Sequence, residues 1–161
     1  MIVPKYYENL DVLHQNTMPN RAYYIPASFA DTNLLENREL SDRFQLLSGQ
    51  WQFRYYPSIY EAKEEFYREG FDTSDFDSVN VPGVWQNYGY DHHQYTNTRY
   101  PFPMDPPYVP YENPCGEYVK SFYYKKDEKA PKAFLNFEGV DSCFYVWVNG
   151  TFVGYSQVSH A

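Results

Sequence analysis

The sequence contains no long apolar run and few cysteines. No apolar stretch approaches the roughly 20 residues of a membrane-spanning helix, and the first five residues lack the apolar core of a secretion signal. The two cysteines, Cys115 and Cys143, do not make a disulfide framework. With no basic side chain near them in sequence, they are expected to be small buried apolar residues, not nucleophiles. We therefore expect a soluble, cytoplasmic protein with no membrane partner.

Positive charge is also scarce. The 161 residues contain 13 basic and 21 acidic side chains, which gives a formal net charge of -8. Without a basic stripe, such a chain is not expected to bind nucleic acid or anionic lipid. Its length suits one domain and is too short for a (β/α)₈ barrel, which takes about 250 residues.

The usual catalytic motifs are missing as well. The sequence has no glycine-rich phosphate loop, no His-Glu-x-x-His, no Cys-x-x-Cys and no nucleophile elbow. His92 and His93 follow Asp91, but adjacent loop residues point apart, so an exposed turn is expected there and not a metal site. A solvated helix face is the expected role of four nearby acidic residues: Glu61, Glu64, Glu65 and Glu69. Nothing in the sequence itself predicts a cofactor.

Aromatic residues are abundant instead. The chain has 19 Tyr, 12 Phe and 3 Trp, and aromatic side chains favour strands. Trp51, Phe53 and Tyr55 alternate with polar residues, which is typical of a half-buried strand. A second alternating run precedes Asn149-Gly150, a pair that favours a tight hairpin turn over a glycosylation site. These patterns predict a mainly β fold.

Other segments complete the predicted organisation. Residues 1–38 are irregular and predict an extended N-terminal arm that needs a surface to lie on. Residues 39–161 predict an incomplete β-sandwich, with further strands over 118–124 and 133–137. One short helix is expected from Ser58, which would form a capping box with Glu61, to Gly70. Six of the 12 prolines lie between Trp85 and Gly116, which indicates a functional loop or docking surface.

Three runs in this half of the chain resemble a known family. They are VPGVWQNYGYDHHQYTNTRYPF from Val81, DPPYVPYENPCGEY over 105–118, and FEGVDSCFYVWVNGTFVGYSQVS over 137–159. Together with the earlier LLSGQWQFRYYP and RAYYIP segments, they are similar to the N-terminal sugar-binding domain of family 2 β-galactosidases. The similarity covers roughly residues 20–161, with the motifs in the family's order.

The resemblance implies a jelly-roll sandwich of the galactose-binding-domain-like type within a larger enzyme. Such enzymes hydrolyse terminal β-D-galactosides such as lactose with retention, use two glutamates in a separate (β/α)₈ barrel, and are assisted by magnesium and sodium. This chain would then be a fragment that lacks the barrel and is inactive alone. Its expected partners are the β-galactoside substrate, the remaining domains of the same enzyme and, when full length, further copies in a homo-oligomer.

The resemblance also implies site residues. In the family, the Asn of a Tyr-Thr-Asn motif contacts the galactosyl unit, and here that residue is Asn97. The alternative is a loop asparagine that caps its own backbone. Gln157 lies where the family has a polar residue near an accessory cation. Trp85 and Tyr95 are expected to pack the loop, and Trp147 to pack the sheet, with a sugar-stacking role left open.

Two other functions stay open on the sequence. One is a stand-alone carbohydrate-binding module that performs no hydrolysis. The other is a fragment of a β-glucuronidase or β-mannosidase relative, which would share the sandwich but bind a different sugar. A reading frame that continues into further strands and a barrel would support the β-galactosidase, whereas a natural stop would support the binding module.

Overall fold

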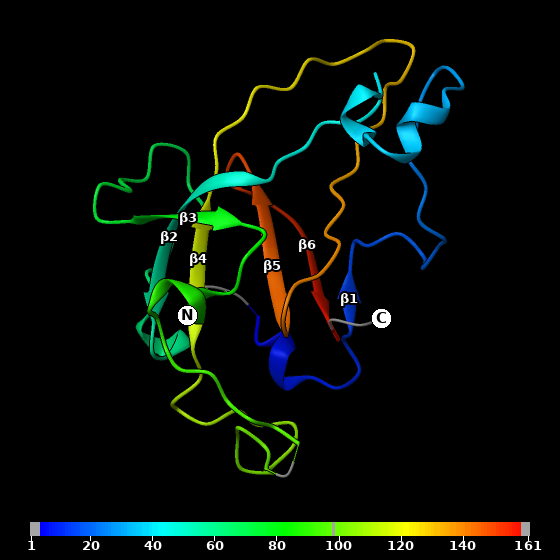
Figure 1. The fold of residues 1–161 in the computed structure, drawn as a ribbon. Helices are drawn as coiled ribbons and strands as arrows, with labels where there is room; N and C mark the ends of the chain where they lie inside the picture. The colour runs from blue at the N-terminus through cyan, green and yellow to red at the C-terminus, as the bar shows by residue number, and fades with distance from the viewer. Residues whose placement is uncertain (1–3, 98, 159–161) are drawn as a thin grey trace.

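The computed structural model describes residues 4–97 and 99–158, and its regular structure is almost entirely antiparallel strand. One sheet has the order β3-β2-β4 and the other the order β1-β6-β5. The strands are β1 (His14–Gln15), β2 (Gly49–Tyr56), β3 (Asp77–Val81), β4 (Cys115–Val119), β5 (Cys143–Val148) and β6 (Thr151–Gln157). Figure 1 shows β4 of the first sheet running alongside β5 of the second. The predicted mainly β sandwich is confirmed.

The strongest local patterns form the expected strands. In β2, Phe53 is completely buried while Gln52 is exposed, as the alternation predicts. β5 and β6 form a hairpin in which Val148 pairs with Thr151. Asn149 and Gly150 make its turn with φ of 48° and 75°, a left-handed pair that suits Asn and Gly better than other residues.

The predicted helix from Ser58 to Gly70 is wrong beyond its first turn. The Ser58 hydroxyl does accept a hydrogen bond from the Tyr60 N–H (3.3 Å), but η4 (Ile59–Glu61) ends within three residues. Farther on, Phe66 and Tyr67 lie against Trp147 of β5, and the Tyr67 and Trp147 rings stack at 4.8 Å. This distant aromatic contact outweighs local helix propensity. Short 3₁₀ turns are the only helices in the described residues, and the other four are η1 (Tyr6–Glu8), η2 (Thr32–Leu35), η3 (Arg38–Leu40) and η5 (Trp85–Tyr88).

The strands predicted over 118–124 and 133–137 are also largely wrong. β4 begins at Cys115 and ends at Val119, and residues 133–137 are irregular. Between these two legs, Asp127 and Ala130 form an isolated bridge. A strand needs a neighbour for its backbone hydrogen bonds, and neither leg pairs with a strand in the described part of the chain. Their aromatic side chains, including Phe122 and Phe134, are exposed as a result.

The N-terminal segment follows the β1-β6-β5 sheet at first. β1 pairs with β6, His14 opposite Ser156 and Gln15 opposite Tyr155. The ring of Tyr6 in η1 lies 5.3 Å from that of Tyr155, which is only 1% exposed. The arm therefore has the surface it needs. Its limit at residue 38 stays a prediction, and residues 1–3 of the expected arm and residues 98 and 159–161 of the expected sandwich lie outside the described residues.

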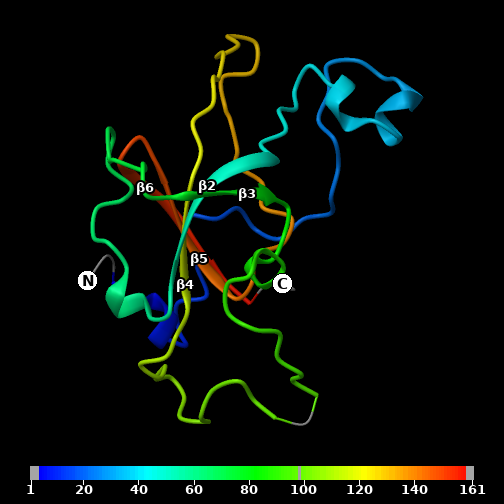
Figure 2. The same cartoon turned by 60° about the vertical axis from the view of Figure 1, so that its left-hand side comes forward.

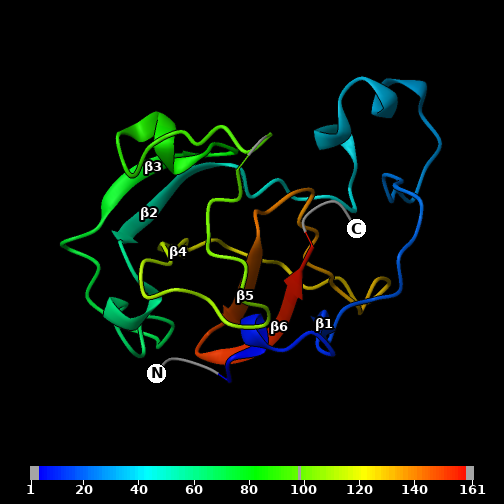
Figure 3. The ribbon, with the colours of Figure 1, turned by 90° about the horizontal axis from the view of Figure 1, so that it is seen from below.

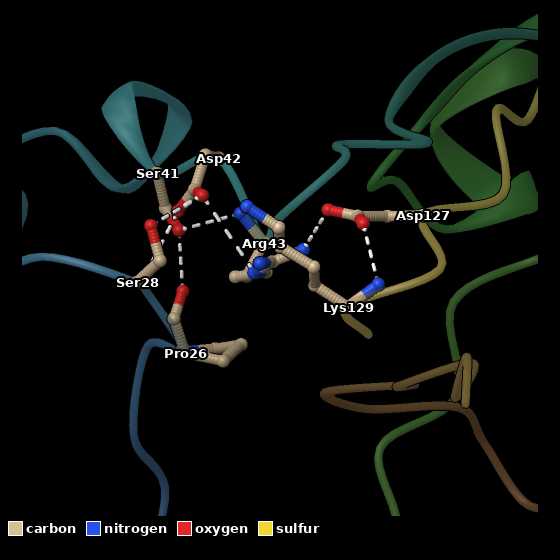
Figure 4. Close-up of polar contacts among 7 residues, drawn as sticks. All are labelled: Pro26, Ser28, Ser41, Asp42, Arg43, Asp127 and Lys129. Atoms are coloured by element: carbon tan, nitrogen blue, oxygen red, sulfur yellow. Dashed lines mark hydrogen bonds and ion pairs between the residues drawn. The ribbon is translucent and has the colours of Figure 1, made fainter. Parts of the chain in front are cut away.

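The later part of this segment is tied down by a different set of contacts, shown in Figure 4. Ser28 donates through its hydroxyl to Asp42 (2.6 Å), and the Ser41 hydroxyl donates to the Pro26 carbonyl. Arg43 pairs with Asp127 at the tip formed by residues 127–130. We call Ser28, Ser41, Asp42, Arg43 and Asp127 the polar clasp. It links the chain before β2 to the tip between β4 and β5.

Candidate functional site

A long irregular segment, the proline-rich loop, lies between η5 and β4 and is described over residues 89–97 and 99–114. It extends away from both sheets in two views of the molecule (Figures 1 and 2). Few backbone hydrogen bonds lie within it, for example from the Tyr108 N–H to the Asp105 carbonyl (2.9 Å). Its shape therefore depends on how its two legs are attached to the sheets.

The first leg is attached through rings. Trp85 lies against Phe53 and Tyr55 of β2, with ring centroids 6.3 and 5.7 Å away. Gly116 makes room for this contact, because a Cβ there would come within 2.7 Å of the Phe53 ring and 3.0 Å of the Trp85 ring. Trp85 packs the base of the loop as expected.

Tyr90 continues the same leg. Its ring contacts Phe53 edge to face at 5.0 Å and stacks on Tyr55 at 5.8 Å, while its hydroxyl donates to Asp77 of β3 (2.5 Å). Burial, with the hydrogen bond to Asp77, raises the pKa of Tyr90 to about 12. The tyrosine therefore stays neutral and remains a hydrogen-bond donor at any physiological pH.

The second leg returns next to η4. Tyr111 stacks on Tyr60 with centroids 5.6 Å apart and ring planes 15° apart. The Ile59 N–H also donates to the carbonyl of Asn113 at 2.9 Å. The first leg is thus fixed to the β3-β2-β4 sheet and the second to η4, the turn that follows β2. The tip between the two legs is exposed.

Asn97 lies at that exposed tip. Its Nδ2 donates to the Tyr95 hydroxyl at 2.8 Å, and no hydrogen bond from its side chain to the backbone is present in the described residues. Tyr95 is 76% exposed, so the expectation that Tyr95 packs the loop is wrong. The Tyr95 hydroxyl instead holds the Nδ2 end of the Asn97 amide, and Oδ1 at the other end has no hydrogen bond from the described residues and can accept one from a hydroxyl group.

Gln157, near the end of β6, faces the arm. Its Nε2 donates to the carbonyls of Val12 (2.8 Å) and Asn9 (3.4 Å). With these two carbonyls as its neighbours, the amide is placed with its nitrogen on that side. Its contact with a cation stays a prediction. Trp147, by contrast, packs the sheet as expected, between Tyr67 and Tyr145.

The remaining candidates from the sequence are His92 with His93 and the two cysteines. His92 is exposed and contacts Asp91 (3.0 Å), and residues 4–97 and 99–158 contain no group of three His, Cys, Asp or Glu side chains that could hold a metal. Burial raises the pKa of Cys115 to about 12 and that of Cys143 above its usual value. Neither thiol is therefore an activated nucleophile.

Sequence reasoning missed one buried carboxyl group. Glu117 of β4 is 1% exposed, accepts a hydrogen bond from the Tyr56 hydroxyl (3.2 Å), and has no partner for its Oε1 among the described residues. Burial raises its pKa to about 7. The signal was present, because Glu117 occupies the same strand face as Cys115 and Val119, where a charge is out of place.

No helix in the described residues is long and apolar enough to cross a membrane. The chain matches the family described as "Glycosyl hydrolases family 2, sugar binding domain" over residues 44–161. That range contains both sheets except β1, and the whole proline-rich loop.

The individual relatives that the chain resembles are named β-galactosidases. The chain is 47% identical over 160 residues to a β-galactosidase of Actinobacillus pleuropneumoniae, 44% over 162 to one of Staphylococcus xylosus, and 35% over 161 to one of Priestia megaterium. These alignments cover 99%, 100% and 97% of this chain. The chain spans only 15% of the first relative and 16% of the other two.

Proposed function

The chain belongs to glycosyl hydrolase family 2, and on this basis we propose that it supplies the sugar binding domain and one substrate-contacting loop of a β-galactosidase. The identity of 47% over 99% of the chain to a β-galactosidase carries this proposal. The proposed substrate is a terminal β-D-galactoside such as lactose. We further propose that the two sheets form part of a jelly-roll sandwich in a cytoplasmic enzyme that assembles as a homo-oligomer.

The role of Asn97 in that enzyme is to orient the galactosyl unit. The Tyr95 hydroxyl holds its Nδ2, so the amide presents its carbonyl oxygen in a defined direction. A fixed acceptor contributes more to binding than a rotating one, because less side-chain freedom is lost when the sugar arrives. The exposed Tyr95 ring beside Asn97 offers flat apolar surface for one face of a sugar.

We propose that the reacting carboxyl groups lie in other domains of the enzyme. Retaining hydrolysis needs two carboxyl groups about 5–5.5 Å apart on either side of the glycosidic bond. The carboxyl group with a raised pKa in this chain, Glu117, is buried against Tyr56, where no substrate can reach it. The chain on its own should therefore hydrolyse no β-galactoside.

The resemblance implies magnesium and sodium for the whole enzyme, and the described residues alone offer no carboxylate site for either ion. They contain no cluster of three acidic, His or Cys side chains, and the Gln157 amide nitrogen is directed at carbonyls of the arm. We derive no step of the reaction through a cation bound to this chain.

Substitution of Asn97 in the whole enzyme tests the proposal. Asn97→Ala should lower kcat/KM for an aryl β-galactoside roughly 5- to 150-fold, which corresponds to about 1–3 kcal/mol for one lost hydrogen bond to substrate. Asn136→Ala is the matched control, because Asn136 is also exposed and irregular but precedes β5 on a different loop. Wild-type kinetics in Asn97→Ala would remove Asn97 from the site. Binding of galactose by the whole protein without any hydrolysis would instead support a carbohydrate-binding module.

A further inference from the structure

We propose that Lys5 and Glu8 of the arm are positioning residues for the proline-rich loop: they fix its second leg and so set the place of Asn97 in the substrate site. The inference rests on the proposed function for its effect on catalysis. The attachment itself is a property of this chain and can be tested without a substrate.

The first step is that η1 is firmly held by the β1-β6-β5 sheet. The Tyr145 hydroxyl accepts a hydrogen bond from the Tyr6 N–H (3.1 Å) and donates one to the Pro4 carbonyl (2.9 Å). The Tyr6 ring also stacks on that of Tyr145, with ring planes 13° apart. Because the backbone on both sides of Lys5 is fixed, the side chains of this turn leave the sheet in defined directions.

The second step is that these side chains reach the loop. Lys5 Nζ lies 3.0 Å from Glu8 Oε2 and 3.1 Å from the Tyr60 hydroxyl. Glu8 is 13% exposed, and its other oxygen accepts a long hydrogen bond from the Val109 N–H (3.5 Å). Tyr60 in turn stacks on Tyr111. The arm therefore contacts the second leg at Val109 directly and at Tyr111 through Tyr60.

The third step is electrostatic. Hydrogen bonds to Tyr60 and Glu8 raise the pKa of Lys5 above its ordinary value, so the ammonium form is retained throughout the physiological range. A charged lysine with two oxygen partners is oriented more strongly than one exposed to solvent alone. This arrangement joins the arm, η4 and the loop, three segments that are far apart in sequence.

The consequence concerns binding more than chemistry. A loop with few internal hydrogen bonds must be ordered when it closes on a ligand, and an attachment made beforehand reduces that entropic cost. Loss of the attachment should therefore raise KM and leave kcat nearly unchanged. A merely structural role would lower thermal stability and leave the loop and KM unaffected.

The experiment compares matched ion pairs in the whole protein. Glu8→Ala and Lys5→Ala remove the Lys5–Glu8 pair. Glu65→Ala removes the Glu65–Arg68 pair, which has the same sequence spacing and lies next to the β5–β6 turn at Gly150. Glu8→Gln keeps an acceptor for the Val109 N–H and serves as the conservative variant. The readouts are the rate at which chymotrypsin cuts after Tyr95 and Tyr108, two exposed residues of the loop, identified by mass, and KM and kcat for an aryl β-galactoside.

We expect Glu8→Ala and Lys5→Ala to accelerate loop cleavage and raise KM, each about threefold, because a partly buried ion pair and one long hydrogen bond are modest contributions. Glu8→Gln should restore most of both properties, and Glu65→Ala should match wild type. Equal cleavage in Glu8→Ala and Glu65→Ala would overturn the inference. If the protein hydrolyses no β-galactoside, the proposed function fails, but the cleavage rates still decide whether the arm holds the loop.

Discussion

The two halves of the N-terminal arm are attached to the same fold by opposite kinds of contact. In the first half, the Tyr6 ring packs against Tyr145 and Tyr155, and His14 and Gln15 pair with β6. The second half continues past residue 38 into the residues before β2, and over Pro26 to Arg43 it is held by polar contacts that include the polar clasp (Figure 4). Seen from below, the first half crosses the ends of β5 and β6 and the second half runs outside the sheets (Figure 3). Buried rings contribute far more to stability than exposed ion pairs, so the first half should be the one the fold depends on.

Removal of the central ring of the first half should have the largest effect. Tyr155 is 1% exposed and lies 4.6 Å from the Tyr145 ring and 5.3 Å from that of Tyr6. Tyr155→Ala should lower the free energy of unfolding by about 3–5 kcal/mol, because a large buried ring leaves a cavity. Urea unfolding measures this. Val153→Ala, at an exposed position of the same strand, is the control, and an equal loss in both variants would contradict the assigned importance of the ring.

The second prediction concerns pH, because the stability contributed by buried Glu117 and that contributed by Asp42 of the polar clasp change in opposite directions as the pH rises. The pKa of Glu117 is raised from 4.5 to about 7, so the folded state holds this proton more tightly than the unfolded state. Stability from this group is therefore complete below about pH 4.5 and is lost as the pH rises to about 7. In the polar clasp, hydrogen bonds from Ser28 lower the pKa of Asp42. That contribution is present above pH 3.8 and is lost as the pH falls through the lowered value.

Glu117→Gln separates these two effects. The amide carries no charge, so the variant should match wild type near pH 4.5 and exceed its stability at pH 8 by about 3 kcal/mol, at about 1.4 kcal/mol for each pKa unit. Asp42→Asn should instead lose its difference from wild type only in strong acid. Urea unfolding at pH 4.5 and pH 8 measures both. A stability difference between Glu117→Gln and wild type that is the same at the two pH values would show that Glu117 does not titrate in this range.

The third prediction isolates the hydroxyl that anchors η1. Tyr145→Phe keeps the stacked ring but removes both hydrogen bonds to the arm, which should cost about 1–2 kcal/mol. Chymotryptic cleavage after Tyr6 and Tyr7 should accelerate in this variant. Tyr90→Phe loses a hydroxyl bonded to Asp77 without contact to the arm and should leave that cleavage unchanged. An arm that stays protected in Tyr145→Phe would mean that stacking and β1 pairing suffice to hold it.

The same contrast between local and distant contacts decides what could be predicted from the sequence. The alternation of β2 and the Asn149-Gly150 turn are local signals, and both appear in the structure as expected. The helix predicted after Ser58 is wrong because Tyr67 stacks on Trp147. The two residues are 80 positions apart, and no local pattern in the sequence predicts that they pair. The strands expected over 118–124 and 133–137 fail for a related reason, since a strand pattern does not say whether a neighbour exists.

The candidate site also combines a feature that is local in sequence with contacts between distant segments. The motif around Asn97 is local, so its position on an exposed loop could be anticipated, while its contact with a sugar stays a prediction. The roles of Glu8 and Tyr145 depend on contacts between distant segments. Neither residue lies in a pattern that singles it out. Only the folded arrangement brings the arm to the second leg of the loop.

The smallest effect is expected in the polar clasp. Arg43 pairs with Asp127 at the surface, and the Asp127 side chain is about half exposed. Arg43→Ala should lower Tm by only about 1–2 °C at low ionic strength, because solvent screens exposed pairs and holding two long side chains costs entropy. The difference should vanish in 1 M salt, where the Debye length falls to about 3 Å, whereas the loss in Tyr145→Phe should persist. Arg43→Lys keeps the charge and should retain most of the stability at low salt. If Arg43→Ala were as damaging as Tyr145→Phe, and equally so in high salt, the second half of the arm would be held as firmly as the first, and the distinction between the two halves would fail.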